Sequence, residues 1–416
     1  MRRFVALSLV IVAGLAVNLP PVSAVEPPLV EKFLVAGRLS DGQKALAERL
    51  KTKPDDDEAR FGLGTLQFLG AVERLAQSLY KFGALGSETR LGQRLPILRI
   101  AVPNNPAPEK VTYADVRDIL RRFLDDLAIA DTTLTGVKDR NVKLPLHFGL
   151  IHLDLNGDGR ASDDETLWRI YGGLNRGLRR GAEIQPRDAE AFVIGFDYAD
   201  VQWLRGYCHL LSSLCEVALA YDQQSLFDAI GRQIFAKAQS PALPEALLKH
   251  DMNMDEIADA IAAIHLAHYP LKEPARMKSA LAHLQQVVQC SRENWKAIQA
   301  ETDDDREWIP SSTQTGVIRG VRIAPEMIAG WQDFLNEADR LLAGKKLAPH
   351  WRFNAQHGIN LRRVFEEPRE FDLVLWAHGA AAVPYTEEGE VSDPQTWMRL
   401  QQVFQGQFIG FAFWFN

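Results

Sequence analysis

The chain has 416 residues, of which 46% are apolar and 24% are charged, and its formal net charge at pH 7 is −7. This composition is that of an ordinary globular protein with ample apolar material for a core. An acidic chain lacks the basic face that nucleic acid or an anionic membrane requires, so we expect neither as a partner.

Residues 1–24 are organised like a secretory signal peptide. Arg2 and Arg3 form the charged start, residues 4–17 form a short apolar core, and residues 22–24 are a small-residue cleavage site. No later segment approaches 18 unbroken apolar residues, so we expect no membrane insertion after cleavage. The mature chain, whose charge becomes −9 without the two arginines, is therefore predicted to be exported, either periplasmic or secreted.

The first mature segment is predicted to be helical. Its pattern near residues 43–85 is similar to one tetratricopeptide repeat, and the similarity is carried by Pro54, Leu63, Gly64, Ala76 and Tyr80. That resemblance implies a groove for a protein or peptide partner. One and a half repeats cannot bury a solenoid core, however, and a plain helical hairpin explains the same pattern.

A strong helix is predicted over residues 113–130, after a proline-rich link at residues 96–108. Thr112 is a suitable N-cap, and apolar residues from Val116 to Ala130 recur at helical spacing.

Residues 154–165 have the composition of a twelve-residue calcium loop. Ca²⁺ takes six to eight oxygen ligands, and the loop offers oxygens at the required positions 1, 3, 5, 7, 9 and 12. These positions hold Asp154, Asn156, Asp158, Arg160 (through its carbonyl), Ser162 (through a water) and Glu165. Gly159 occupies position 6, where the chain turns sharply. The loop resembles the EF-hand family at every liganding position, and the resemblance implies bound Ca²⁺.

The segments on either side of the loop depart from that family. Residues 163–178 can form the exiting helix, but residues 144–153 contain a proline and a glycine and suit an extended segment as well as a helix. We find no second complete loop. A single unpaired site favours a structural clamp over a calcium switch, because a switch needs a bistable helix pair.

Four helices are predicted after Asp200, over residues 201–221, 224–239, 254–267 and 275–300, separated by short proline-bounded connections that favour a bundle. Cys208 and Cys215 lie two helical turns apart, beyond the reach of a disulfide. Either one could pair with Cys290, or all three could be buried free thiols.

Histidines provide the main alternative chemistry. His209, His265, His268 and His283 lie in neighbouring predicted helices and could hold a transition metal, but no carboxylates stand beside them at helical spacing. Buried, hydrogen-bonded histidines explain them better. Nucleophile elbows and phosphate-binding loops are absent from the sequence.

The last hundred residues are predicted to mix helix and strand. A helix is expected over residues 325–342, and short strands over residues 316–323, 358–364, 371–376 and 408–415. Four tryptophans in this segment could form a ligand platform or the core of the small β element. They are Trp351, Trp376, Trp397 and Trp414.

We therefore predict a mainly α protein: a bundle-like helical body with one EF-hand-type loop and a small antiparallel β addition near the C-terminus. Its predicted parts are residues 1–24 (signal peptide), 25–95 (N-terminal helices), 109–300 (helical domain with the loop) and 301–416 (mixed C-terminal segment). We expect a non-enzymatic binding or scaffolding protein with a structural Ca²⁺ site. The alternative is an exported hydrolase with a calcium-stabilised cleft, which would bring His350, His357 or His378 next to a carboxylate.

Overall fold

The computed structural model describes residues 27–85, 102–169, 186–239, 258, 261–318 and 322–415. The predicted signal peptide lies outside these residues. Within them the chain is mainly α-helical, and its strands form two-stranded antiparallel sheets. The predicted fold class is confirmed. None of the helices in these ranges is both long and apolar enough to cross a membrane.

The helices occupy both halves of the chain. They are α1 (Glu31–Val35), α2 (Leu39–Thr52), α3 (Asp57–Lys81), α5 (Tyr113–Leu134), α7 (Pro186–Ala191), α8 (Tyr198–Ala220), α9 (Gln224–Ile234), α11 (Ala275–Ile298), α12 (Pro325–Leu342), α13 (Leu361–Glu366), α14 (Leu373–His378), α15 (Pro394–Val403) and α16 (Phe408–Phe415). The strands pair as β1 (Lys143–Leu146) with β2 (Ile194–Asp197), β3 (His268–Tyr269) with β5 (Phe371–Asp372), and β4 (His357–Ile359) with β6 (Thr386–Glu388).

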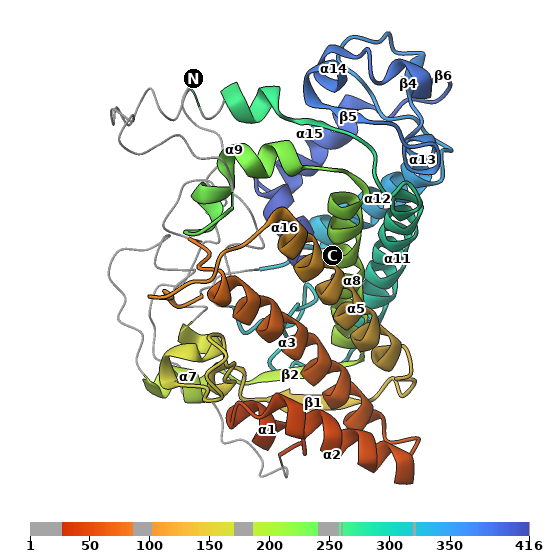
Figure 1. The fold of residues 1–416 in the computed structure, drawn as a ribbon. Coiled ribbons are helices and arrows are strands. Elements are labelled where there is room, and N and C mark those ends of the chain that lie inside the picture. Colours follow the sequence, from red (N-terminus) through yellow and green to blue (C-terminus); the bar gives the residue numbers. More distant parts are fainter. Residues whose placement is uncertain are drawn as a thin grey trace.

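The long helix α8 packs against both α5 and α11 in the middle of the molecule (Figure 1). The N-terminal helices α1, α2 and α3 lie at one end with the β1–β2 pair. The short elements α13, α14, β4 and β6 lie at the opposite end (Figure 1). The calcium-loop sequence follows β1 and therefore belongs to the N-terminal end.

Polar caps explain where several long helices begin. The Thr112 hydroxyl accepts a hydrogen bond from the Asp115 N–H, while the Asp115 carboxylate accepts one from the Thr112 N–H, so α5 starts at a reciprocal capping box. The cap predicted at Thr112 is thereby confirmed. Asp197 and Asp200 form the same arrangement at the start of α8.

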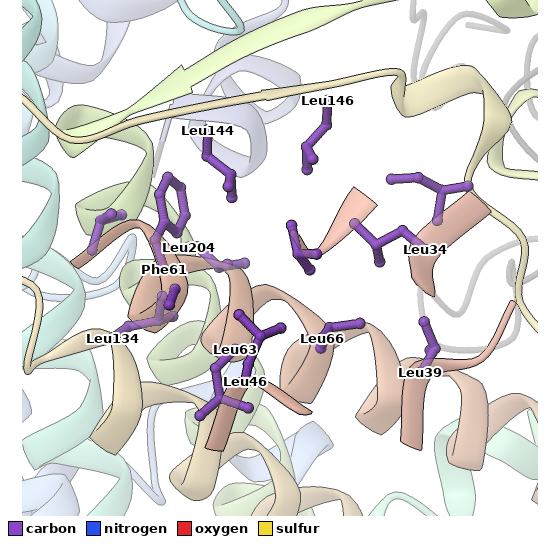
Figure 2. Close-up of a cluster of buried hydrophobic side chains, with 14 of the residues drawn as sticks. Leu34, Leu39, Leu46, Phe61, Leu63, Leu66, Leu134, Leu144, Leu146 and Leu204 are labelled. Atoms are coloured by element: carbon purple, nitrogen blue, oxygen red, sulfur yellow. The ribbon is translucent and has the colours of Figure 1, made fainter. Parts of the chain in front are cut away.

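Apolar side chains from β1 and the N-terminal helices form one buried cluster. Leu144 and Leu146 point from β1 towards α3, where Leu63 and Leu66 face them (Figure 2). The cluster continues beyond β1 into Ile151, Leu153 and Leu155, each 1% exposed. The segment leading to residue 154 is extended at residues 144–146 and again at residues 151–153, where alternate residues are buried, and it makes a single 3-10 turn at Phe148–Leu150 between them.

A second large cluster joins α11 to the C-terminal segment. Trp295 and Trp331 are each 1% exposed and pack with Phe404 and Phe408.

All three cysteines are free and buried, so the structure supports the interpretation that they are free thiols.

All four of the short strands predicted near the C-terminus are wrong in whole or in part. Residues 408–415 form helix α16, because an eight-residue apolar run has no periodicity that separates a buried helix from a buried strand. Residues 361–366 and 373–378 are helices that follow two- or three-residue strands, and each begins at a side-chain cap, Asn360 or Asp372. The part of residues 316–323 that is described makes an isolated bridge at Gly316 rather than a strand.

Candidate metal centre

Residues 154–165 begin where the extended core segment reaches the surface. Because Leu153 and Leu155 point into the core, the side chain of Asp154 between them points outwards. The two ends of the loop are tied together by backbone bonds, Leu153 N–H to Glu165 O (3.1 Å) and Leu167 N–H to Ile151 O (2.8 Å).

The Asp154 carboxylate organises the first half of the loop. It accepts hydrogen bonds from the backbone N–H groups of Gly157 (2.8 Å), Gly159 (3.0 Å) and Asp158 (3.2 Å). Gly157 and Gly159 have φ angles of 74° and 82°, which side chains other than glycine rarely tolerate. The chain therefore wraps around the first carboxylate.

Glu165 closes the loop from its last position. Its side chain accepts hydrogen bonds from Leu155 N–H (2.9 Å), Ser162 N–H (2.9 Å) and the Ser162 hydroxyl (2.8 Å), and the residue is only 2% exposed. Among the described residues no lysine, arginine or histidine forms an ion pair with Glu165, Asp154 or Asp158. A buried carboxylate normally has a cationic partner, so this arrangement suits a bound cation.

The remaining predicted ligands lie on the exposed side of the loop. The Asn156 side chain accepts a hydrogen bond from Asp158 N–H (2.8 Å), and Asp158 accepts one from Arg160 N–H (2.8 Å). All six predicted ligands thus lie in one loop whose two ends are joined by hydrogen bonds. Their chemistry, with carboxylate, amide, hydroxyl and carbonyl oxygens and no sulfur or nitrogen, fits a hard cation such as Ca²⁺.

The helix predicted to leave the loop at residue 163 is not continuous. Asp163–Glu165 form a single 3-10 turn, and Thr166 is extended because it forms a backbone bridge with His152. Residues 167–169 are helical again, and the rest of the predicted helix lies outside the described residues.

Two residues of α3 contact the loop, and neither was predicted from the sequence. Glu73 Oε2 accepts a hydrogen bond from Asp154 N–H (2.8 Å), and Gln77 Nε2 donates one to Asp154 O (2.8 Å). Burial, together with the negative charges of Asp154 and Glu165, raises the pKa of Glu73 to about 7. The two residues are four apart on an amphipathic helix, and no local motif links them to a loop about 80 residues later.

A second acidic group lies between β2, the start of α8 and residues 301–307. Carboxylate oxygens of Asp197, Glu301 and Glu307 lie within 4.8 Å of one another and could hold a metal ion. Lys143 already supplies a positive charge there, with its Nζ 3.5 Å from Asp197 and 2.9 Å from Asp303. This group is therefore partly compensated, unlike the loop.

The histidines considered as metal ligands are only partly brought together. His209 Nδ1 lies 2.9 Å from His283 Nδ1, and His209 Nε2 lies 3.4 Å from Asp131. His265 is exposed, and His268 instead pairs with Asp372 at 3.2 Å. Two ring nitrogens 2.9 Å apart share a hydrogen bond, so at least one of the rings must be neutral.

Acidification is expected to destabilise the protein through this histidine pair. Burial lowers the pKa of both rings, and for His209 the charges of His283 and Arg205 lower it further. The unfolded chain takes up protons near pH 6.5 while the folded pair resists them, so stability is lost as the pH falls below about 6.5. Urea unfolding at pH 7, 6 and 5 should show a smaller loss in His283→Gln than in wild type or in the exposed control His378→Gln. An equal pH dependence in all three proteins would contradict this assignment.

The C-terminal histidines do not meet a carboxylate. His350 Nε2 lies 3.1 Å from the Trp376 carbonyl, and His357 Nδ1 lies 2.8 Å from the Asn354 side chain. In the part of the chain that the structure covers, no ion pair joins these residues or His378 to an acid.

The C-terminal tryptophans divide between core and surface. Trp376 stacks on Tyr385 (5.9 Å between ring centroids, 9° between planes), and Trp397 packs against Phe334. Both belong to apolar clusters. Trp351 is 78% exposed, so the core interpretation is wrong for this residue.

Comparisons with known proteins identify no relative: no family model, no curated protein and no solved structure matches this chain.

Proposed function

We propose that the protein is an exported, calcium-binding helical protein in which an EF-hand-type loop at residues 154–165 holds one structural Ca²⁺. The observation that carries the proposal is the Glu165 carboxylate at the closing position of a loop wrapped around Asp154: it is buried at 2% exposure and has no basic partner among the residues that the structure describes. Bound Ca²⁺ would supply the missing positive charge and link the two ends of the loop.

A structural role, rather than a switching one, is supported by how the loop is built in. Its entering segment is part of the buried core, and its ends are joined by two backbone hydrogen bonds. Among the described residues the loop is flanked by the 3-10 turns Phe148–Leu150 and Asp163–Glu165 and not by the pair of long helices that a calcium switch opens. We therefore propose a binding or scaffolding protein whose N-terminal end is stabilised by the cation.

A protein or peptide partner would dock on the N-terminal helices. A groove of about 240 Å³ between α3 and α5 is lined by both apolar and basic side chains, including Leu75, Phe123 and Arg122. Gln77 lines the same groove and contacts the loop, so a partner bound there would lie next to the proposed cation site. The alternative of an exported hydrolase predicts a carboxylate beside His350, His357 or His378, whereas among the described residues His350 contacts the Trp376 carbonyl and His357 contacts the Asn354 side chain.

Calcium is expected to stabilise the protein against unfolding. At one hundred times the dissociation constant the gain is about 2.7 kcal/mol, and an exported site of this kind binds with a dissociation constant on the order of 10⁻⁴ to 10⁻³ M. Calorimetric titration and thermal melting with and without Ca²⁺ measure both quantities. Glu165→Gln should lose most of the gain, because it removes a charge and half of a bidentate ligand.

Asp163→Asn is the matched control. It removes the same charge two residues away, from a side chain that is fully exposed and is not a predicted ligand. Wild-type protein that ignores Ca²⁺, or equal losses in Glu165→Gln and Asp163→Asn, would refute the proposed site.

A further inference from the structure

We infer that α3 is part of the calcium site. Glu73 supplies a fourth carboxylate and, together with Gln77, holds the backbone of the first ligand, Asp154. Cation binding at the loop therefore also stabilises α3. This inference rests on the proposed function. It adds two residues that lie outside the loop sequence, and it names the element that the cation would hold in place.

The geometry at Asp154 carries the inference. Its N–H donates to Glu73 (2.8 Å) and its C=O accepts from Gln77 (2.8 Å), so both backbone polar groups of the first ligand are held by one helix. Glu73 and Gln77 are one turn apart and share a face of α3. With both ends of this residue fixed, the direction of the Asp154 side chain is set by α3.

The helix that makes these contacts is well anchored. Around Glu73 and Gln77, Ala71, Leu75 and Ala76 are between 0% and 4% exposed in the core. The resembled family places a helix directly before the loop, but here that position is an extended segment. A helix from elsewhere in the chain therefore supports the first ligand in its place.

The carboxylate of Glu73 adds negative charge to the proposed cation site, which a residue that only packed against the loop would not do. The described residues include no ion pair for Glu73, and its nearest helical arginine, Arg74, pairs with Asp126 at 2.8 Å. The Glu73 carboxylate accepts a hydrogen bond from the Asp154 N–H (2.8 Å) and so lies directly beside the first residue of the loop. Together with Asp158, the site would present four carboxylates to a divalent ion, and affinity in such sites rises with the number of charged groups.

Two variants separate charge from positioning. Glu73→Gln removes the charge but keeps an oxygen that can accept the Asp154 N–H, whereas Gln77→Leu removes a hydrogen bond without changing the charge. Supporting residues of this kind typically change metal affinity about 10- to 100-fold. We expect calorimetry to show Ca²⁺ affinity reduced by that factor in Glu73→Gln, and reduced less in Gln77→Leu.

The same protein offers matched controls. Glu58→Gln removes an exposed acid from the same helix. Gln43→Leu removes an equivalent bond, since Gln43 Nε2 donates to the Leu66 carbonyl at 3.0 Å. Neither change should affect Ca²⁺ affinity. Hydrogen exchange should show that Ca²⁺ slows exchange of the backbone amides at residues 70–81 in wild type, and that this protection is lost in Glu73→Gln.

Failure of this inference can be told apart from failure of the proposed function. If wild type binds Ca²⁺ and Glu165→Gln does not, but Glu73→Gln binds within twofold of wild type and α3 gains no protection, the inference is wrong and the loop site stands. If wild type does not bind Ca²⁺, both are wrong. Melting curves without Ca²⁺ check that each variant is folded, and if Glu73→Gln does not fold, Gln77→Leu and the exchange of wild-type α3 decide the question.

Discussion

Replacing Arg117 with methionine is expected to lower the free energy of unfolding by about 3 to 5 kcal/mol. Arg117 is 4% exposed, and its guanidinium donates to the carbonyls of Leu219 (2.7 Å) and Tyr221 (2.9 Å). These carbonyls lie at the C-terminal end of α8, where carbonyl groups have no N–H donor within the helix. Methionine keeps the volume of the side chain but removes the donor to the Leu219 carbonyl, and it leaves the Tyr221 carbonyl with only a long hydrogen bond from the Tyr113 hydroxyl (3.4 Å).

An ion pair adds to this effect. Arg117 Nη2 lies 2.5 Å from Glu273. Burial alone would raise the pKa of Glu273, but hydrogen bonds from Arg276, Arg121 and Arg117 lower it to about 2. The carboxylate therefore stays charged at neutral pH, and loss of Arg117 removes its most buried partner.

Chemical denaturation at pH 7 measures the loss, and Arg121→Met is the control. Arg121 also reaches Glu273 (3.0 Å), but its side chain is 40% exposed, so its removal should cost no more than about 1 kcal/mol. Similar losses in the two variants would show that the carbonyls at the end of α8 do not depend on Arg117.

The second large effect is a loss of stability as the pH rises from about 4.5 to about 7, caused by the acidic group at Asp197. Burial and the charge of Asp197 raise the pKa of Glu307 to about 7 and raise that of Glu301 as well. A folded pKa above the unfolded value means that the folded state binds more protons within this window. The stability is thus complete below pH 4.5 and is lost as the carboxyls ionise.

The size of this effect is on the order of 2 to 4 kcal/mol across the window, after allowance for solvent screening at the partly exposed Glu301. Asp197→Asn should flatten the pH dependence and stabilise the protein at pH 8, since it removes the charge that repels both glutamates. Asparagine remains a good N-cap, so α8 keeps its start. The exposed Asp55→Asn serves as control.

The acidic group and the histidine pair have opposite signs between pH 4.5 and 6.5. Over this range acidification protonates the carboxyls, which favours folding, while the histidines of the unfolded chain gain protons, which opposes it. The free energy of unfolding of wild type can therefore change little with pH in this range, because two large contributions of opposite sign cancel. If Asp197→Asn retained both the wild-type profile between pH 4.5 and 7 and the wild-type stability at pH 8, repulsion between these carboxylates would not be what controls stability.

Local signals in the sequence predicted much of the helical body. Thr112 with Asp115 marks the start of α5, and the helix predicted over residues 325–342 coincides with α12, which begins at Pro325. Caps and prolines act within one turn, so their effect can be inferred without the rest of the fold. The alternation of Leu144 and Leu146 likewise matches β1, although its partner β2 could not be identified in advance.

Residues that act across the fold could not be predicted. Glu73 lies 81 residues before Asp154, and Glu301 lies 104 residues after Asp197. The first pair meets only because α3 packs beside the loop, and the second only because residues 301–307 lie beside the start of α8. The error at residues 408–415 has a different cause. An eight-residue apolar run can be buried as a helix or as a strand, and tertiary packing decides which.

Helix α8 contributes side chains to four separate apolar clusters, through residues such as Ala199, Leu204, Cys208 and Ala220. The first two clusters also both draw members from α3 and α5, whereas the third draws on α11, α12 and the C-terminal helices and the fourth on Met277 of α11. All four clusters therefore pack on the same helix. Disrupting any one of them exposes part of the α8 surface against which a neighbouring cluster packs. Among the residues seen here, the two ends of the molecule should accordingly come apart together rather than one at a time.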